Sequence, residues 1–409
     1  MKKQITSTLF ARQAIYDSLN QVCAYELLYR AGDLFRANID LSNEKAGDDA
    51  TSFILSHLFT HLDINTIVGA HPAYINFTRN HLLKRIPTLL PKKKVIIELL
   101  ENTVIDESLI ESVKNLREDG YRLALDDFIF REELVPLVDL ADVIKIEVLG
   151  LSKDEIKRQI APLVGSKAKL LAEKIENRDQ LLLCKELGFE LFQGFFLNYP
   201  DLIHGNLLSE NKTYLLKLFA EIYDVDVHME RVEEIILQIP KLSYQVLRLA
   251  NSAALYKGKK IESLMDAIRQ LGLIQIRNWL SLLLVSSLDD VAPDLLERTL
   301  IRAKMCQNLA TISELANPHQ AYTVGMLSTL DAILNETMPS LLGKIRLSDE
   351  LNEALLKHQG ALGYLLAMTQ WFEQANFSKL DYEKFSPEDY NQAYLEGIAY
   401  ASAVLEVAK

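Results

Sequence analysis

The stretch Tyr121–Phe128, YRLALDDF, decides the fold of the first half of this sequence. It predicts a β-strand, because a short apolar run with Leu123 and Leu125 at alternate positions is typical of a buried strand. Two adjacent carboxylates, Asp126 and Asp127, follow that run. Neighbouring anions repel each other unless a cation lies between them, and a divalent metal is the usual partner for carboxylate oxygens. For this dipeptide alone an exposed turn is the alternative, since Asp is common in turns.

Segments rich in Val, Ile and Leu alternate with helical segments through the first half of the chain. Strands that alternate with helices of about 10–15 residues indicate βαβ units and a parallel sheet. Seven such strands favour a small TIM-like (β/α) barrel, in which polar residues at the carboxyl ends of strands are active-site candidates. We expect these strands at 22–29, 74–77, 95–100, 122–128, 143–149, 170–174 and 190–197.

Each expected strand carries a polar or charged residue. Charged side chains inside apolar strands are seldom buried unless they are paired or bind a metal. Taken singly, several have ordinary explanations, such as ion pairs of Glu26 with Arg30 or of Lys145 with Glu147. Their repetition in seven strands is the argument for one shared site. Its candidate members are Glu26, Asn76, Glu98, Glu101, Asp126, Asp127, Lys145, Glu173, Glu176 and Gln193.

The order of these residues resembles that of the EAL domain, a family of bacterial cyclic-di-GMP phosphodiesterases, over about residues 5–200. The resemblance implies two Mg²⁺ or Mn²⁺ ions and a substrate site at Glu26 and Arg30. It also implies that Glu173 is the general base, that Lys145 and Gln193 hold the attacking water or the metals, and that Glu101 anchors the catalytic loop. The metal ligands it implies are Glu26, Asn76, Glu98, Asp126, Asp127 and Glu176.

The residues that follow Asp127 depart from the family pattern. EAL domains have a flexible glycine-rich loop there, which closes over the metals and supports dimerisation, whereas this chain has FIFREE at 128–133. The spacing from Asp126 to Lys145 is roughly two residues shorter than in active relatives. Glu147 stands where the family has Asp. Because such loops set the metal geometry and close the site, these departures predict weak or absent hydrolysis.

Leucine-rich helical periodicity replaces the strand pattern after about residue 203, which predicts a second, all-α domain. The expected domains are therefore 1–202 and 203–409. Within the second, the stretches 239–256 and 261–280 resemble the HDOD domain, a relative of the metal-dependent HD phosphohydrolases, over about residues 204–395. Ala267 and Gly272 are expected at close-packed positions.

The HD hydrolases need an adjacent His-Asp pair as metal ligands, but the matching stretch of this chain has Ser328-Thr329. Without that pair a catalytic metal site is not expected in the second domain. The resemblance therefore implies a platform that binds a protein partner.

Composition excludes several classes of protein. The net charge is −12 and neither half is basic, which argues against a nucleic-acid-binding protein. The three cysteines are widely spaced and odd in number, as suits a reducing cytoplasm. The N-terminal residues lack the apolar run of a signal peptide, and no apolar stretch of about 18 residues occurs, so we expect a cytoplasmic protein without membrane segments.

Three functions fit these observations. The altered loop favours a signalling protein of the cyclic-di-GMP network, whose degenerate EAL domain binds nucleotide or a partner and relays its state through the HDOD domain. The first alternative is an active Mg²⁺- or Mn²⁺-dependent phosphodiesterase that produces linear pGpG. The second alternative is a scaffold whose carboxylates only form internal pairs. A homodimer is compatible with each of them.

Overall fold

The computed structural model describes residues 8–31, 64–100, 103–194, 217–224, 226–237, 246, 263–286, 293–334, 336–345 and 347–408. The chain divides into two compact units, one of residues 1–199 with 372–378 and one of residues 200–371 with 379–409. The expected border after residue 202 lies outside the described residues and stays a prediction. The helix expected at 48–62 also lies outside them.

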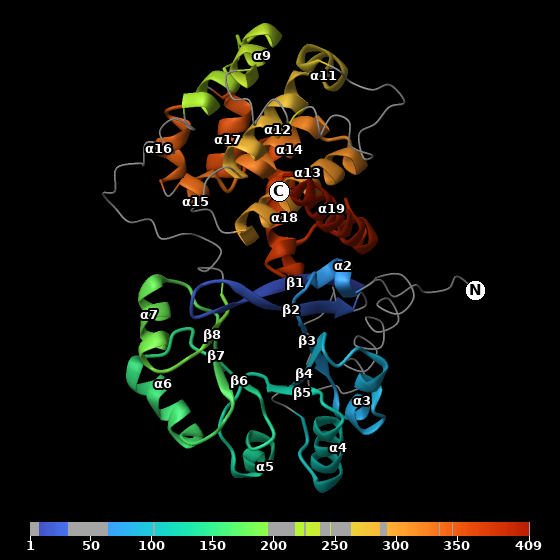
Figure 1. The fold of residues 1–409 in the computed structure, drawn as a ribbon, viewed down its shortest axis with the longest axis vertical. Coiled ribbons are helices and arrows are strands. Elements are labelled where there is room, and N and C mark those ends of the chain that lie inside the picture. Colours follow the sequence, from blue (N-terminus) through green and yellow to red (C-terminus); the bar gives the residue numbers. More distant parts are fainter. Residues whose placement is uncertain are drawn as a thin grey trace, which may run out of the picture. The chain divides into compact units, whose positions relative to one another are not determined.

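Eight strands close into a barrel in the first unit, in the order in which they occur along the chain (Figure 1). Strands β2 to β8 run parallel to their neighbours, but β1 runs antiparallel to both β2 and β8. The expected TIM-like barrel is confirmed, and the seven expected strands correspond to the parallel strands β2 to β8, but the antiparallel strand β1 was not expected. The strands are β1 Thr8–Asp17, β2 Val22–Ala31, β3 Ala73–Phe77, β4 Val95–Leu99, β5 Arg122–Leu125, β6 Val143–Glu147, β7 Lys169–Glu173 and β8 Leu191–Phe192.

Helices cover the outside of the barrel (Figure 1). Several begin at a side chain that accepts a hydrogen bond from the first turn: Asp106 caps α4, Ser152 forms a capping box at α6, and Asn177 caps α7. Such caps satisfy the free N–H groups at helix starts. They fix where each strand-to-helix connection ends. The elements are α2 Ile64–Val68, α3 Arg79–Leu83, η2 Ile86–Leu89, α4 Glu107–Glu118, η3 Glu132–Leu134, α5 Val135–Val138, α6 Lys153–Ile160, η4 Ala161–Leu163 and α7 Arg178–Glu186.

An apolar layer fills the barrel interior with one buried residue from each strand. Because side chains two positions apart in a strand share a face, this layer fixes which residues of every strand point inward. Burying these side chains is the main stabilising contribution to the barrel. The layer consists of Ile15, Ala24, Tyr74, Ile96, Ala124, Val143, Leu171 and Leu191.

The second unit is helical in all of its described elements, as the sequence predicts. Helix α13 packs against α14 and α19. A Cβ on Gly325 of α14 would come within 2.6 Å of Ala303 Cα, so glycine permits this close helix packing. The elements are α9 Met229–Leu237, α11 Leu264–Leu271, α12 Leu273–Ser286, α13 Pro293–Ser313, α14 Pro318–Leu327, α15 Leu330–Leu334, α16 Met338–Leu342, α17 Asp349–Lys357, α18 Gly360–Glu373 and α19 Pro387–Ala408. The last two residues of α18 and most of η6 Phe377–Lys379 belong to the first unit.

The role expected of Gly272 is wrong, whereas Ala267 is fully buried as expected. Gly272 follows α11 with a φ of 83°, and a Cβ placed there would meet no atom of the described residues within 4 Å. This glycine is therefore required by backbone conformation and not by close packing, because residues with a side chain rarely adopt a positive φ.

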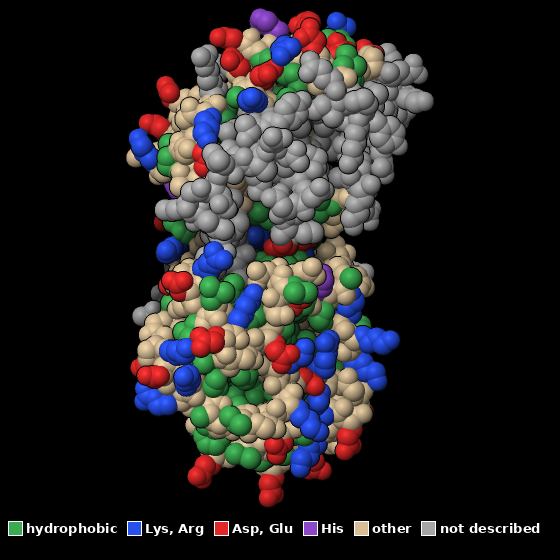
Figure 2. Space-filling model, turned by 60° about the vertical axis from the view of Figure 1, so that its left-hand side comes forward, with side chains coloured by type: hydrophobic (Ala, Val, Ile, Leu, Met, Phe, Trp, Pro, Cys, Tyr) green, Lys and Arg blue, Asp and Glu red, His purple; other side chains and the backbone are tan. Residues whose placement is uncertain are grey.

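The described helices and one face of the surface give two further observations. No described helix combines the length and the apolar character needed to cross a membrane. Acidic and basic side chains are interspersed over the face seen in Figure 2.

Candidate metal centre in the barrel

A polar layer lies directly above the apolar layer, at the carboxyl ends of the strands. In β2 to β8 the residue two positions beyond the apolar layer is polar or charged in every case. Since those two positions share a face of the strand, the polar residues converge inside the barrel mouth. They are Glu26, Asn76, Glu98, Asp126, Lys145, Glu173 and Gln193.

Lys145 of β6 is fully buried and bonds to four of these carboxylates. Its Nζ lies 2.8 Å from Asp126 Oδ1 and 2.8 Å from Glu173 Oε1. It lies 3.3 Å from Glu26 Oε2 and also contacts Glu98 Oε1. One ammonium group therefore holds together acids that are contributed by widely separated parts of the sequence.

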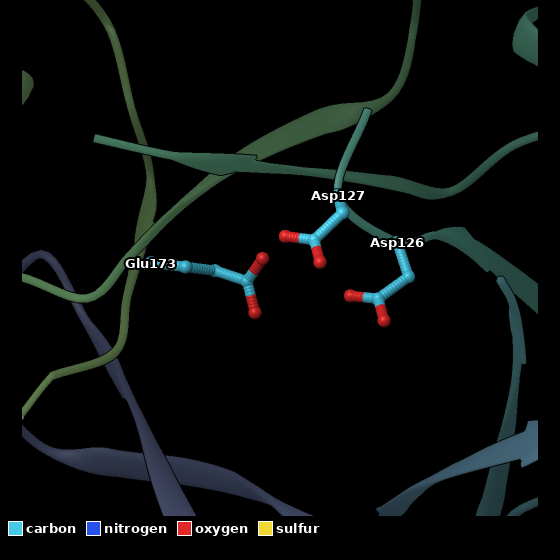
Figure 3. Close-up of side chains that lie close together, drawn as sticks. All are labelled: Asp126, Asp127 and Glu173. Carbon is cyan, nitrogen blue, oxygen red and sulfur yellow. The ribbon is translucent and has the colours of Figure 1, made fainter. Parts of the chain in front are cut away.

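Asp127 joins the site through an unusual backbone conformation. Consecutive residues of an extended strand point to opposite faces, so Asp126 and Asp127 would ordinarily diverge. Asp127 instead has a φ of 42°, in the left-handed region that Asp tolerates better than most residues. Both carboxylates then reach the same space as Glu173, and one oxygen of each of the three lies within 4.8 Å of the others (Figure 3).

The β7–β8 contact positions Glu26 and Gln193. Gln193 Nε2 donates a hydrogen bond to Glu26 Oε2 at 2.7 Å, and Gln193 O accepts one from the Ile175 N–H at 3.1 Å. Gly194 follows, and a Cβ there would overlap the backbone of Ile175. Glycine is therefore needed for β8 to approach the end of β7 this closely.

Burial shifts the pKa values of the acids in the direction that disfavours their charged forms. It raises the pKa of Glu98 well above its usual value and that of Glu173 to about 8, although Lys145 lowers both. It raises the pKa of Asp127 as well. Burial alone would lower the pKa of Lys145, but Glu173 and the other acids raise it well above its usual value. The nearby lysines thus do not fully compensate the burial of Glu98, Glu173 and Asp127.

These residues fit divalent metal ions on three grounds. Four carboxylates pair with one ammonium and Asp127 lies beside two of them, and buried charge is costly unless it is compensated. Carboxylate and amide oxygens are the donors that Mg²⁺ and Mn²⁺ prefer. Gln193 Oε1 is buried and accepts no hydrogen bond from the described residues, so it can accept one from a metal-bound water. The scaffold hypothesis explains the Lys145 pairs but not this excess of acid.

For the remaining candidate residues, the structure shows fewer contacts with the site, or the residues lie outside the part of the chain that it describes. Asn76 is the penultimate residue of β3 and lies beside Glu98 in the strand register. Glu176 is exposed at the start of α7, with its backbone N–H bonded to Gln180 Oε1, so its role as a ligand stays a prediction. The backbone of Arg30 lies in β2, but its side chain is not described, and Glu101 lies outside the described residues.

Sequence reasoning missed one member of the polar layer, because it did not predict β1. Gln13 lies two residues before Ile15 on this antiparallel strand and is in register with Glu26. The strand register therefore places Gln13 at the eighth position of the layer. Alternation of Leu9, Ala11 and Ile15 along Thr8–Asp17 was the available signal.

The loop after Asp127, whose sequence departs from the EAL pattern, is only partly anchored to the site. Phe128 is buried, and its N–H bonds to Lys145 O at 2.9 Å. Ile129 is 63% exposed and Phe130 is also exposed. The loop lines a pocket beside Asp126, together with residues of the β4–α4 connection. The start of the loop is thus fixed to the site, and its following apolar residues face solvent.

The helical unit has hydroxyl groups at the position where an HD hydrolase has its metal ligands. Thr329 Oγ1 lies 2.8 Å from Thr299 Oγ1, and Arg302 Nη1 donates to Ser328 Oγ at 3.1 Å. Within the described ranges, the one group of acid, His or Cys side chains placed to share a metal is the barrel cluster of Asp126, Asp127 and Glu173.

Comparison with known proteins agrees with this two-part organisation. Residues 57–200 match the EAL domain, and residues 208–371 match the HDOD domain. The cyclic di-GMP phosphodiesterase CdgJ of Vibrio cholerae is 30% identical over 402 residues, covering 95% of this chain and 91% of that protein. The uncharacterized protein YuxH of Bacillus subtilis is 31% identical over 409 residues, covering 97% of this chain and 98% of that protein.

The barrel with acids at its mouth and the helical unit together define a two-domain class of protein. The relatives that align along nearly the whole chain define the family within that class. This chain belongs to the family of proteins in which an EAL domain is followed by an HDOD domain. A solved structure, the manganese and cyclic-di-GMP complex of Klebsiella pneumoniae BlrP1, is 22% identical with a TM-score of 0.36, covering 48% of this chain and 56% of that one.

Proposed function

We propose that the barrel is a metal-dependent phosphodiesterase that hydrolyses cyclic-di-GMP to linear pGpG. The observation that carries this proposal is the convergence of Asp126, Asp127 and Glu173 around one space, next to the Lys145 ammonium. A relative that aligns along nearly the whole chain is named as a cyclic di-GMP phosphodiesterase. Together these observations favour turnover over the binding-only role that the loop sequence suggests.

The chain's own residues have distinct tasks in this reaction. Mg²⁺ or Mn²⁺, held by Glu26, Asn76, Glu98, Asp126 and Asp127, would supply charge neutralisation at the phosphate and a water of lowered pKa. Glu173 accepts the proton of the attacking water, and a base with a pKa near the working pH is suited to this role. Lys145 fixes the position of the Glu173 carboxylate at 2.8 Å. Gln193 orients Glu26 through its amide.

The test is a turnover assay on the full chain with cyclic-di-GMP and either Mn²⁺ or Mg²⁺, with pGpG measured by chromatography. Glu173→Gln should lower kcat by about 100-fold or more, because it removes the proposed base. Glu190→Gln is the matched control, since Glu190 is an exposed acid at the opposite end of the adjacent strand. Absence of pGpG with both metals, or undiminished turnover in Glu173→Gln, would contradict the proposal.

A second candidate function is nucleotide binding with little hydrolysis, relayed through the helical unit to a protein partner. The specific observation in its favour is the loop at 128–133, with Ile129 and Phe130 exposed where EAL domains have glycines. Cyclic-di-GMP binding without pGpG formation would support this candidate. The Ser328 and Thr329 hydroxyls favour a binding role for the helical unit in either case.

A further inference from the structure

Lys174 has a backbone conformation that its side chain disfavours. Its φ is 55°, in the left-handed region, and it directly follows Glu173 at the end of β7. Non-glycine residues in this region are energetically unfavourable and are concentrated at functional sites. The other described cases lie in a turn or close to a helix end, except for Asp127, which is itself a member of the metal cluster.

The Lys174 side chain places a positive charge at the barrel mouth. Its Nζ bonds to Glu147 Oε2 at the end of the neighbouring strand, so Glu147 is not the partner of Lys145 that its sequence position suggested. The side chain is 54% exposed. Burial would lower the pKa of Lys174, but Glu147, Asp127 and Glu173 raise it above its usual value. The ammonium therefore stays charged and lies close to the acids of the site.

We propose that Lys174 is a substrate-binding residue that contacts a phosphate of cyclic-di-GMP, held in position by Glu147. This proposal rests on the function proposed above. The substrate is a dianion, and the charge-neutralising groups of the site are buried within it, so a half-exposed ammonium at its edge is suited to a phosphate outside the reacting centre. The cost of the left-handed backbone is then offset by a contact that glycine at this position could not make.

The test is calorimetric titration of cyclic-di-GMP into the full chain with Mn²⁺, in a Glu173→Gln background that prevents turnover. Lys174→Met should weaken the Kd about tenfold, as expected for loss of one charged hydrogen bond. Lys174→Arg should stay within about threefold of the parent. Lys169→Met is the matched control, because Lys169 is similarly exposed and paired, but lies at the opposite end of β7.

Each outcome separates the two proposals. Failure of both the unmodified chain and the Glu173→Gln parent to bind cyclic-di-GMP would overturn both. Binding by the parent with an unchanged Kd in Lys174→Met would overturn only the role of Lys174. A Mn²⁺ titration without nucleotide tests a purely structural role: removal of a positive charge should not weaken Mn²⁺ binding, so a loss of Mn²⁺ affinity in Lys174→Met would contradict the proposal.

Discussion

At the scale of single residues, Lys145 dominates the site because it compensates the buried carboxylates of Glu26, Glu98 and Glu173 and the partly buried carboxylate of Asp126. In metal-free protein, Lys145→Met should lower the free energy of unfolding at neutral pH by about 3–5 kcal/mol, since unpaired buried charges remain. Urea denaturation in EDTA measures this. Lys153→Met, which removes an exposed pair with Glu186, should change it by less than about 1 kcal/mol. Equal effects of the two substitutions would contradict the assignment.

Glu173 predicts a specific pH dependence. Its pKa is raised from 4.5 to about 8, chiefly by burial. Because the folded-state pKa is the higher one, its contribution to stability is fully present below about pH 4.5 and is lost as the pH rises through about 8. Metal-free protein should therefore lose stability over this range relative to Glu173→Gln, whose amide does not titrate. Parallel stability curves for the two proteins, measured by denaturation in EDTA, would exclude the raised pKa.

Sequence reasoning identified the residues of the polar layer better than their partners. The candidates at the strand ends follow from period-two alternation, which is local. The partners of Lys145 come from β2, β4, β7 and the end of β5, and they meet only because the barrel closes. The ion pair of Lys145 with Glu147, which proximity in the sequence suggested, is therefore wrong. The left-handed conformation of Asp127 was not predictable either, because Asp adopts it only when its surroundings impose it.

At the scale of elements, the β7–β8 contact controls the position of Gln193. Gly194→Ala would force the backbone of β8 away from Ile175. It should lower the free energy of unfolding by about 1–3 kcal/mol, as overpacking does, and also weaken Mn²⁺ binding. Gly343→Ala is a suitable control, since a Cβ there meets its nearest atom at 3.4 Å and its φ is −65°. Denaturation and Mn²⁺ titration of both variants decide whether this close approach is required.

The elements that were not predicted have recognisable causes. In β1, Arg12 and Gln13 interrupt the apolar pattern, although Arg12 is buried against the Tyr25 ring. In α18, Gly360 and Gly363 lower the apparent helix propensity, while close approach to His358 at Gly363 is the physical reason for the second glycine. The strand expected to reach Phe128 ends at Leu125, because the chain turns at Asp127.

At the scale of the whole molecule, the sequence predicts a barrel followed by a helical domain, and both are present. The order of the domains follows from the change in hydrophobic periodicity near residue 203, which is a strong signal because it extends over the full length of each half. Catalytic competence does not follow from periodicity, since it depends on metal binding and on the loop after Asp127. The two proposed functions share the metal site and differ in turnover.

The central claim is that divalent metal binds where Asp126, Asp127 and Glu173 converge. Crystals of the full chain grown with Mn²⁺ test it most directly through anomalous scattering at a wavelength where manganese contributes strongly. We predict an anomalous peak coordinated by Asp126 and Asp127 at the barrel mouth, and loss of that peak in Asp127→Asn. A fully Mn²⁺-equilibrated crystal with no peak in the barrel mouth, or with manganese bound elsewhere, would contradict the account.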